Sequence, residues 1–108
     1  MEIKHDPVND LLREGKIDEV NNIIAAGGKP SFSNTDFRSM SLIGLNATGL
    51  DFSNTHFLLS DLTDLDLSTC ELKGANLKGA KVCGTLFPPE IPAMEIIMSI
   101  EHGTRLRY

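Results

Sequence analysis

The sequence predicts an all-β solenoid closed by helical caps, and a five-residue repeat is the main reason. In steps of five from Phe32, every position up to Phe87 is apolar, and most are Leu or Phe. The residue two before each is small or apolar, the residue one before is usually Asp, Asn, Glu or Ser, and Gly recurs two after. Amphipathic segments with helical spacing flank this stretch on both sides.

A period of five fits neither a helix, which needs 3.6, nor a strand, which needs 2. It predicts a chain that turns a corner every five residues, so that four corners close one coil after twenty residues. Two residues of each five point inward, and the polar residues and glycines face outward. Stacked coils then share backbone hydrogen bonds at roughly the 4.8 Å spacing of paired strands.

Residues twenty apart are therefore expected to stack in columns, and Ala47 is the one small residue among them. The large neighbours Leu45 and Leu50 should supply the missing volume, because interiors are close-packed. Cys70 falls at an inward position and Cys83 at an outward one, so we expect no disulfide between them. The four predicted columns are Phe32, Phe52 and Leu72; Phe37, Phe57 and Leu77; Leu42, Leu62 and Val82; and Ala47, Leu67 and Phe87.

Residues 1–29 are the predicted N-terminal helical cap of a single domain, 1–108. Asp6-Pro7 is typical of a helix start, and a helix is expected over Pro7–Glu14, followed by a second over Ile17–Ala26. The pair resembles the helices of one ankyrin repeat. Solenoids of that kind need about three units, so a cap on the neighbouring repeat stretch is favoured.

Residues 30–89 form the repeat stretch, which Pro88 and Pro89 end by removing two backbone donors. Residues 90–108 are the predicted C-terminal cap, with a helix over Pro92–His102. Its apolar arc is wider than one buried stripe needs. Part of it should cover the last coil, and the rest would face a partner subunit or a further domain.

The repeat units resemble those of the pentapeptide-repeat proteins, most cleanly at Ala75-Asn76-Leu77-Lys78-Gly79 and Ala80-Lys81-Val82-Cys83-Gly84. The resemblance implies a right-handed quadrilateral β-helix of about three coils. It also implies a non-catalytic protein–protein interaction or scaffold module, with a small bacterial effector or effector fragment as a variant. The alternative that it implies is an acidic DNA mimic that inhibits DNA gyrase or another DNA-binding enzyme.

Two departures weaken the DNA-mimic alternative. The repeat stretch is about half as long as that of the gyrase-binding pentapeptide-repeat proteins. Its walls also carry basic residues among the acids: Arg38, Lys73, Lys78 and Lys81.

Composition limits the partners. The net charge is -5 and the acids are spread out, which argues against direct nucleic-acid binding. No apolar run approaches the roughly 20 residues of a membrane span, and no signal peptide is visible. We therefore expect a cytoplasmic protein, or one delivered into a host cell if it is an effector. The partner is expected to be a protein, with a homodimer through the C-terminal helix as one form.

The chemistry-bearing residues favour structure over catalysis. The histidines His5, His56 and His102 lack metal-ligand spacing, so no metal or cofactor is expected. The carboxylates of the repeat stand where its turns need them, and no nucleophile motif accompanies them. We therefore expect no catalytic residue and no enzyme. Those carboxylates are Asp36, Asp51, Asp61, Asp64, Asp66 and Glu71.

Apolar residues at outward positions are the candidate contact sites. Ile43, Leu58 and Leu59 interrupt the polar walls of the repeat stretch. An alternative is that a cap helix folds over them. The C-terminal helix adds Ile96, Ile97 and Ile100 as candidates.

Overall fold

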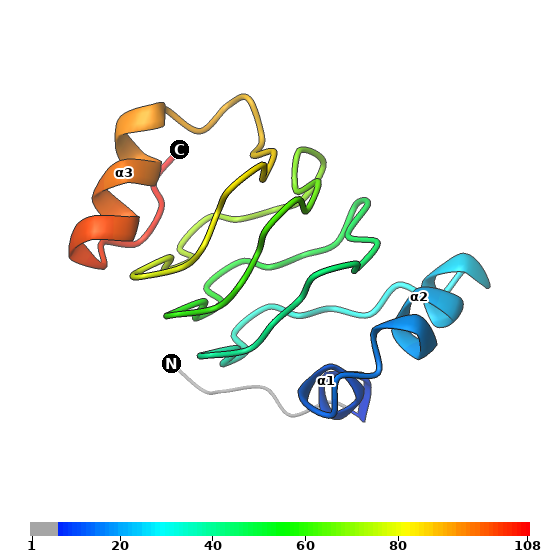
Figure 1. The fold of residues 1–108 in the computed structure, drawn as a ribbon. Helices are drawn as coiled ribbons and strands as arrows, with labels where there is room; N and C mark the ends of the chain where they lie inside the picture. The colour runs from blue at the N-terminus through cyan, green and yellow to red at the C-terminus, as the bar shows by residue number, and fades with distance from the viewer. Residues whose placement is uncertain (1–6) are drawn as a thin grey trace.

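The computed structural model describes residues 7–108, which span 36 × 26 × 20 Å. Three helices flank a coiled central stretch, with α1 and α2 at one end and α3 at the other (Figure 1). They are α1 (Pro7–Arg13), α2 (Ile17–Ala25) and α3 (Ala93–His102). Each bound lies within one residue of the sequence prediction. The predicted cap residue Asp6 lies outside the described residues.

The central stretch, residues 30–87, is called the repeat coil below. Its residues pair in parallel with residues twenty positions on, as in Ser31 with Asp51 and Asp51 with Glu71. The described residues of the coil pair through such single bridges and not through extended strands, because each unit turns a corner after one bridge. We number its four faces from the N-terminal side: first (30–34, 50–54, 70–74), second (35–39, 55–59, 75–79), third (40–44, 60–64, 80–84) and fourth (45–49, 65–69, 85–87).

A tight turn at each corner explains the recurring glycine. The C=O of the inward apolar residue accepts from the N–H three residues on, as from Ala80 to Leu77 at 2.9 Å. The second residue inside the turn has positive φ, +70° at Gly79 and +54° at Asn54. This geometry is that of a type II turn, which favours Gly or Asn at that position. Leu59, at φ +58°, is the bulky exception.

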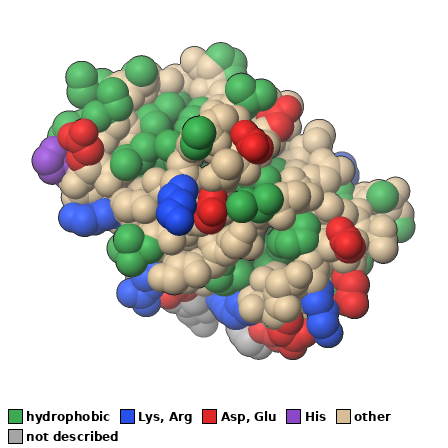
Figure 2. Space-filling model, viewed as in Figure 1, with side chains coloured by type: hydrophobic (Ala, Val, Ile, Leu, Met, Phe, Trp, Pro, Cys, Tyr) green, Lys and Arg blue, Asp and Glu red, His purple; other side chains and the backbone are tan. Residues whose placement is uncertain are grey.

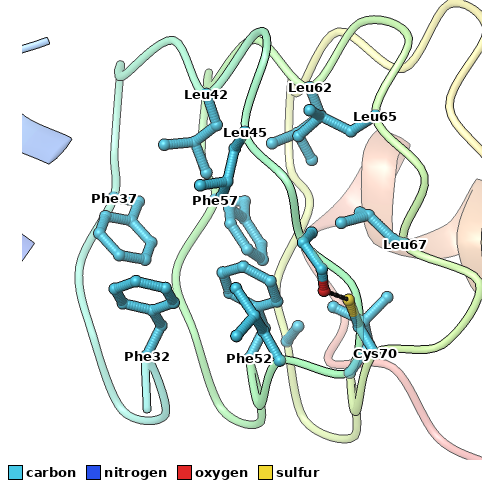
Figure 3. Close-up of a cluster of buried hydrophobic side chains, with 14 of the residues drawn as sticks. Phe32, Phe37, Leu42, Leu45, Phe52, Phe57, Leu62, Leu65, Leu67 and Cys70 are labelled. Carbon is cyan, nitrogen blue, oxygen red and sulfur yellow. Dashed lines mark hydrogen bonds between the residues drawn. The ribbon is translucent and has the colours of Figure 1, made fainter. Parts of the chain in front are cut away.

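The interior of the coil is filled by stacked side chains (Figure 3). The rings of Phe32 and Phe52 stack at 5.4 Å and 18°, and those of Phe37 and Phe57 at 6.0 Å and 27°. All four rings are fully buried, and burial of each contributes about 1.5–3 kcal/mol. Residues twenty apart thus stack as the period of five predicts.

The second inward position of each unit is often polar, and its hydrogen bonds run to the preceding coil. Thr55 Oγ1 donates to the C=O of Phe32 at 2.8 Å, and Cys70 Sγ donates to the C=O of Ala47 at 3.0 Å (Figure 3 draws the second bond). Burial raises the pKa of the Cys70 thiol to about 11. Cys70 is buried and Cys83 is exposed, as their inward and outward positions predict, and both thiols are free.

The fourth face is irregular between the first two coils, where Ala47 stands. Leu45, Ala47 and Leu50 are all buried, so the large neighbours fill the space as expected. Among the described residues, no bridge joins the two coils on this face. Instead, the N–H of Gly49 donates to Thr69 Oγ1 at 2.9 Å.

The helix pair covers the first coil. Leu12 of α1 and Val20 of α2 are buried in the same core as the coil interior. Arg13 donates to the C=O of Asp36 at 2.9 Å, which ties α1 to the second face. Asn21 donates to the C=O of Gly44 at 2.9 Å, which ties α2 to the third.

The last coil is covered on two of its faces by α3 and by residues 104–108, called the closing segment below. The N–H of Leu77 donates to Ser99 Oγ at 2.9 Å, and the N–H of Gly79 donates to the C=O of Ile100 at 3.0 Å. The closing segment pairs antiparallel with the coil through Arg105 and Asn76. The hydrogen-bonding groups of α3 and the closing segment thus occupy the positions that the backbone of a further coil would take.

Candidate protein-contact surfaces

The corner at Leu58 and Leu59, between the second and third faces, is the most exposed apolar point of the coil. Leu59 is 66% exposed, whereas Leu58 is half-buried. Leu59 Cδ2 lies 2.6 Å from where a Cβ on Gly79 would stand, so a side chain at residue 79 would displace it. A left-handed backbone costs a bulky residue roughly 1–2 kcal/mol. Strain of this kind is found preferentially at functional positions.

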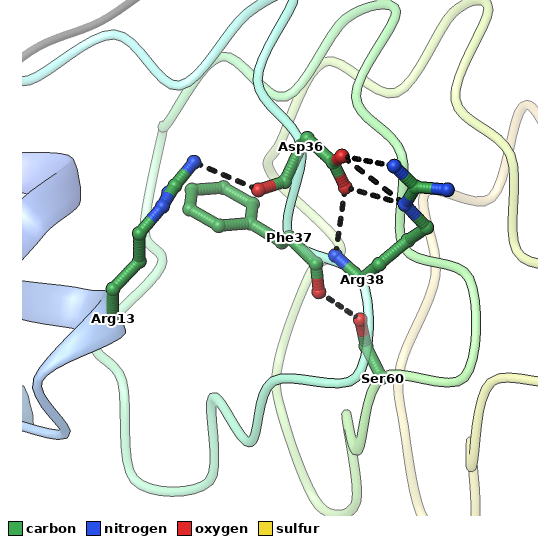
Figure 4. Close-up of polar contacts among 5 residues, drawn as sticks. All are labelled: Arg13, Asp36, Phe37, Arg38 and Ser60. Carbon is green, nitrogen blue, oxygen red and sulfur yellow. Dashed lines mark hydrogen bonds and ion pairs between the residues drawn. The ribbon is translucent and has the colours of Figure 1, made fainter.

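A shallow groove of about 260 Å³ opens beside this corner on the second face, lined by Asp36, Arg38, His56, Leu58 and Asn76. Arg38 donates from Nη2 to Asp36 Oδ2 at 2.8 Å and from Nε to the same oxygen at 3.1 Å (Figure 4). This side-chain hydrogen bonding to Arg38 lowers the pKa of the Asp36 carboxyl. The pair cancels its own charge, so the groove holds no net carboxylate for acid–base work.

Ile43 lies at the opposite edge of the third face from Leu59 and is 49% exposed. Its N–H donates to Ser41 Oγ at 3.4 Å within its own turn. α2 reaches the next residue, Gly44, but does not cover Ile43. The alternative that a cap helix folds over the outward apolar residues therefore fails for Ile43 and Leu59.

The wall between these two corners is polar and mixed in charge. In the middle of this wall, the backbones of Asp61 and Lys81 pair through a parallel β-bridge. A hydrogen bond from the hydroxyl of Thr63 lowers the pKa of Asp61, and the charge of Lys81 acts in the same direction. Acid and base thus compensate each other along this wall.

α3 divides its candidate residues between the core and the surface. Ile96 and Ile100 are half-buried and pack against the core, so they are largely used inside the chain. Ile97 remains 46% exposed. Met94, at 63%, is also open and was not singled out from the sequence.

Sequence reasoning also missed Leu86, which is 57% exposed. It pairs by a bridge with Asp66, so it occupies an outward position that usually holds a polar residue. It could have been found from the sequence, because Leu86 is an apolar residue at a repeat position that usually holds a polar one. The exposure of Met94 had no such signal, because it depends on how α3 docks.

Five of the six carboxylates named from the sequence, all but Asp64, accept the backbone N–H two residues on within their own turns. Asp61 Oδ1 accepts the N–H of Thr63 at 3.1 Å, and Asp66 Oδ1 accepts the N–H of Ser68 at 3.0 Å. Over residues 7–108, no group of three His, Cys, Asp or Glu side chains is placed to hold a metal ion. Of the three helices described, none is long and apolar enough to cross a membrane.

A coil with polar, turn-bonded walls and a few apolar corners indicates a repeat protein of a non-catalytic type. Residues 60–87 match the family model for pentapeptide repeats (8 copies), which identifies this stretch as pentapeptide repeats. The bridge from Ser31 to Asp51 carries the same geometry back beyond the matched residues. No curated protein and no solved structure matches the chain.

Proposed function

We propose that this chain is a non-catalytic protein–protein interaction or scaffold module, built as a right-handed quadrilateral β-helix of about three coils. The observation that carries the proposal is Leu59, an apolar side chain held 66% exposed on a left-handed backbone. Gly or Asn at this position would cost less strain. Burial of Leu59 against a partner would offset that strain by roughly 1–2 kcal/mol.

Rigid surroundings support a recognition role for this corner. The N–H of Leu59 donates to the C=O of Lys78 at 2.9 Å, and the C=O of Leu58 accepts from Ser39 at 2.8 Å. Coils on both sides therefore hold the backbone of the corner. A contact residue that is fixed before binding loses little conformational entropy on association.

The acidic DNA mimic is the alternative, and the compensated charges argue against it. Mimicry needs a surface of one sign, but Asp36 pairs with Arg38, and Lys81 offsets Asp61. A gyrase supercoiling assay decides the matter. Inhibition at low micromolar protein would replace the scaffold proposal with the mimic.

A small bacterial effector or effector fragment is one setting for such a module, in the cytoplasm or inside a host cell. The identity of the partner decides between these settings. A homodimer through α3 would use Ile97 and Met94, the open apolar residues of that helix. Light scattering at two concentrations tests it, because a strict monomer removes this contact.

The contact role of Leu59 is tested with matched variants. Leu59→Asn keeps the left-handed turn, since Asn54 adopts φ +54° at the same place in its own unit. Asp64→Asn is the control, because Asp64 has φ +61° at the next corner of the same coil. Both variants are immobilised beside the unchanged chain and used to capture partners from native-host lysate.

We expect a partner that the unchanged chain and the control retain and that Leu59→Asn loses. Equal melting temperatures for the three proteins would show that folding is not the cause. Capture of the same partners by all three would overturn the role of Leu59.

A further inference from the structure

We propose that the corner at Gly84 and Thr85, at the end of the repeat coil, binds an extended segment of a partner protein through an aliphatic residue. We call it the open corner, comprising residues 82–87. It lies between the third and fourth faces of the last coil, on the side that α3 and the closing segment leave uncovered. This site is distinct from the Leu59 corner, so either proposal can fail without the other.

The opposite corner of the same coil shows how such a site is filled. There the N–H of Gly74 donates to the C=O of Leu106 at 2.8 Å, and the N–H of Leu106 donates to the C=O of Ala75 at 2.9 Å. One extended residue thus satisfies one donor and one acceptor. Its side chain is buried, with 2% exposed, against the end of the coil interior.

The open corner presents the same groups without a partner. Gly84 stands ten residues after Gly74 and shares its turn conformation, with φ +72° against +78°. In the preceding coil, the N–H of Asp64 donates along the stack to Cys83, so the equivalent N–H of Gly84 faces the open end. Within residues 7–108, neither this N–H nor the C=O of Thr85 has a hydrogen-bond partner.

Two further backbone donors at the same edge are also left over. In the preceding coil, the N–H groups of Leu62 and Leu67 donate to Lys81 and Leu86 at 2.9 and 2.8 Å. Their counterparts one coil later, at Val82 and Phe87, find no acceptor in the described part of the chain. The edge therefore offers a row of free donors, which an added strand can pair.

Apolar burial is incomplete at the same place. Leu72 and Leu77, under α3 and the closing segment, are fully buried. Val82 and Phe87 hold the same inward position on the two other faces but remain half-buried. The uncovered surface is therefore apolar as well as rich in free backbone groups, which fits an aliphatic side chain entering beside them.

Apolar side chains are also exposed at this end of the molecule. Figure 2 shows hydrophobic side chains gathered over α3 and the adjoining end of the coil. The exposed members at this end of the chain are Leu86, Met94 and Ile97. Leu86 lies within the open corner itself, so an extended segment bound there would cover its side chain together with the free backbone groups.

The closing segment itself supplies the probe. A capped peptide with the sequence of residues 103–108, GTRLRY, is titrated into the full ¹⁵N-labelled chain, and amide shifts and hydrogen exchange are followed by NMR. The matched control peptide carries N-methyl-leucine, which has the same charge but cannot donate to Thr85. One backbone hydrogen bond lost in this way should weaken binding at least about fivefold.

We expect saturable shifts and slowed exchange at Gly84 and Val82, with Gly74 unchanged and weaker effects from the control peptide. Absence of shifts at about 2 mM peptide would overturn the proposal, as would equal shifts with both peptides. Shifts at Gly74 would mean that the peptide displaces the closing segment, which also contradicts it. Protection of Gly84 in the peptide-free chain, together with a dimer by light scattering, would assign the corner to a second copy instead.

Discussion

Two corner glycines with the same backbone conformation separate the cost of a left-handed turn from the cost of a steric clash. Gly49 has φ +69° and Gly74 has φ +78°. A Cβ on Gly49 would meet nothing within 4 Å, whereas a Cβ on Gly74 would lie 2.0 Å from Asn54 Oδ1 and 3.0 Å from its Cγ. Alanine at either position pays the same backbone strain, but only Gly74→Ala also has to move a neighbour.

The backbone term is roughly 1–2 kcal/mol. The smaller entropy of the unfolded chain offsets about 0.4–1 kcal/mol of it. We therefore expect Gly49→Ala to lower the free energy of unfolding by about 0.5–1 kcal/mol. Gly74→Ala should lose about 1 kcal/mol more, because the side chain of Asn54 must leave its rotamer.

Urea unfolding of the two variants, of Asn54→Gly and of the double variant Asn54→Gly/Gly74→Ala measures these terms. The double-mutant cycle should return a coupling of about 1 kcal/mol between Asn54 and Gly74, since glycine at 54 removes the clash. Equal losses of unfolding free energy in Gly49→Ala and Gly74→Ala, or a coupling near zero, would refute the stacking of the Gly74 corner on Asn54.

Two further predictions concern the C-terminal cap and the groove beside Leu58. Ser99→Ala should lower the free energy of unfolding by about 1–3 kcal/mol, because the buried N–H of Leu77 loses its acceptor. Glu101→Ala is the control, because Glu101 is exposed on the same helix, and it should change the stability little. A loss of stability as large in Glu101→Ala would contradict this reason. The pKa of Asp36 is lowered by Arg38, so its contribution is present above the unfolded carboxyl pKa and is lost as pH falls through the folded pKa. Asp36→Asn should therefore flatten the fall in stability below about pH 4, and an unchanged pH profile would contradict this.

Much of the coil could be predicted from the sequence because its contacts repeat. The period of five gave the inward residues, the columns twenty apart and the turn positions of Gly79 and its equivalents. It also separated Cys70 from Cys83. At the contact sites, the same period showed which apolar residues break the pattern, and Ile43 and Leu59 are indeed exposed.

The ends of the coil could not be predicted in this way. The hydrogen bonds from Leu77 to Ser99 and from Gly74 to Leu106 join the repeat to segments that have no repeat. Nothing in the helical spacing of α3 says which of its apolar residues will face the coil, so Ile96 and Ile97 could not be told apart. Which of the two is buried depends on how α3 docks on the coil.

The sequence by itself thus determined the inside and the corners of the stack, since each unit meets a neighbour of the same pattern. Only the tertiary structure decided which edges of the last coil are covered. α3 and the closing segment satisfy two faces and leave Gly84 and Thr85 open. The physical reason is that covering a backbone edge needs a partner in the right place, and that place is set by packing between distant segments.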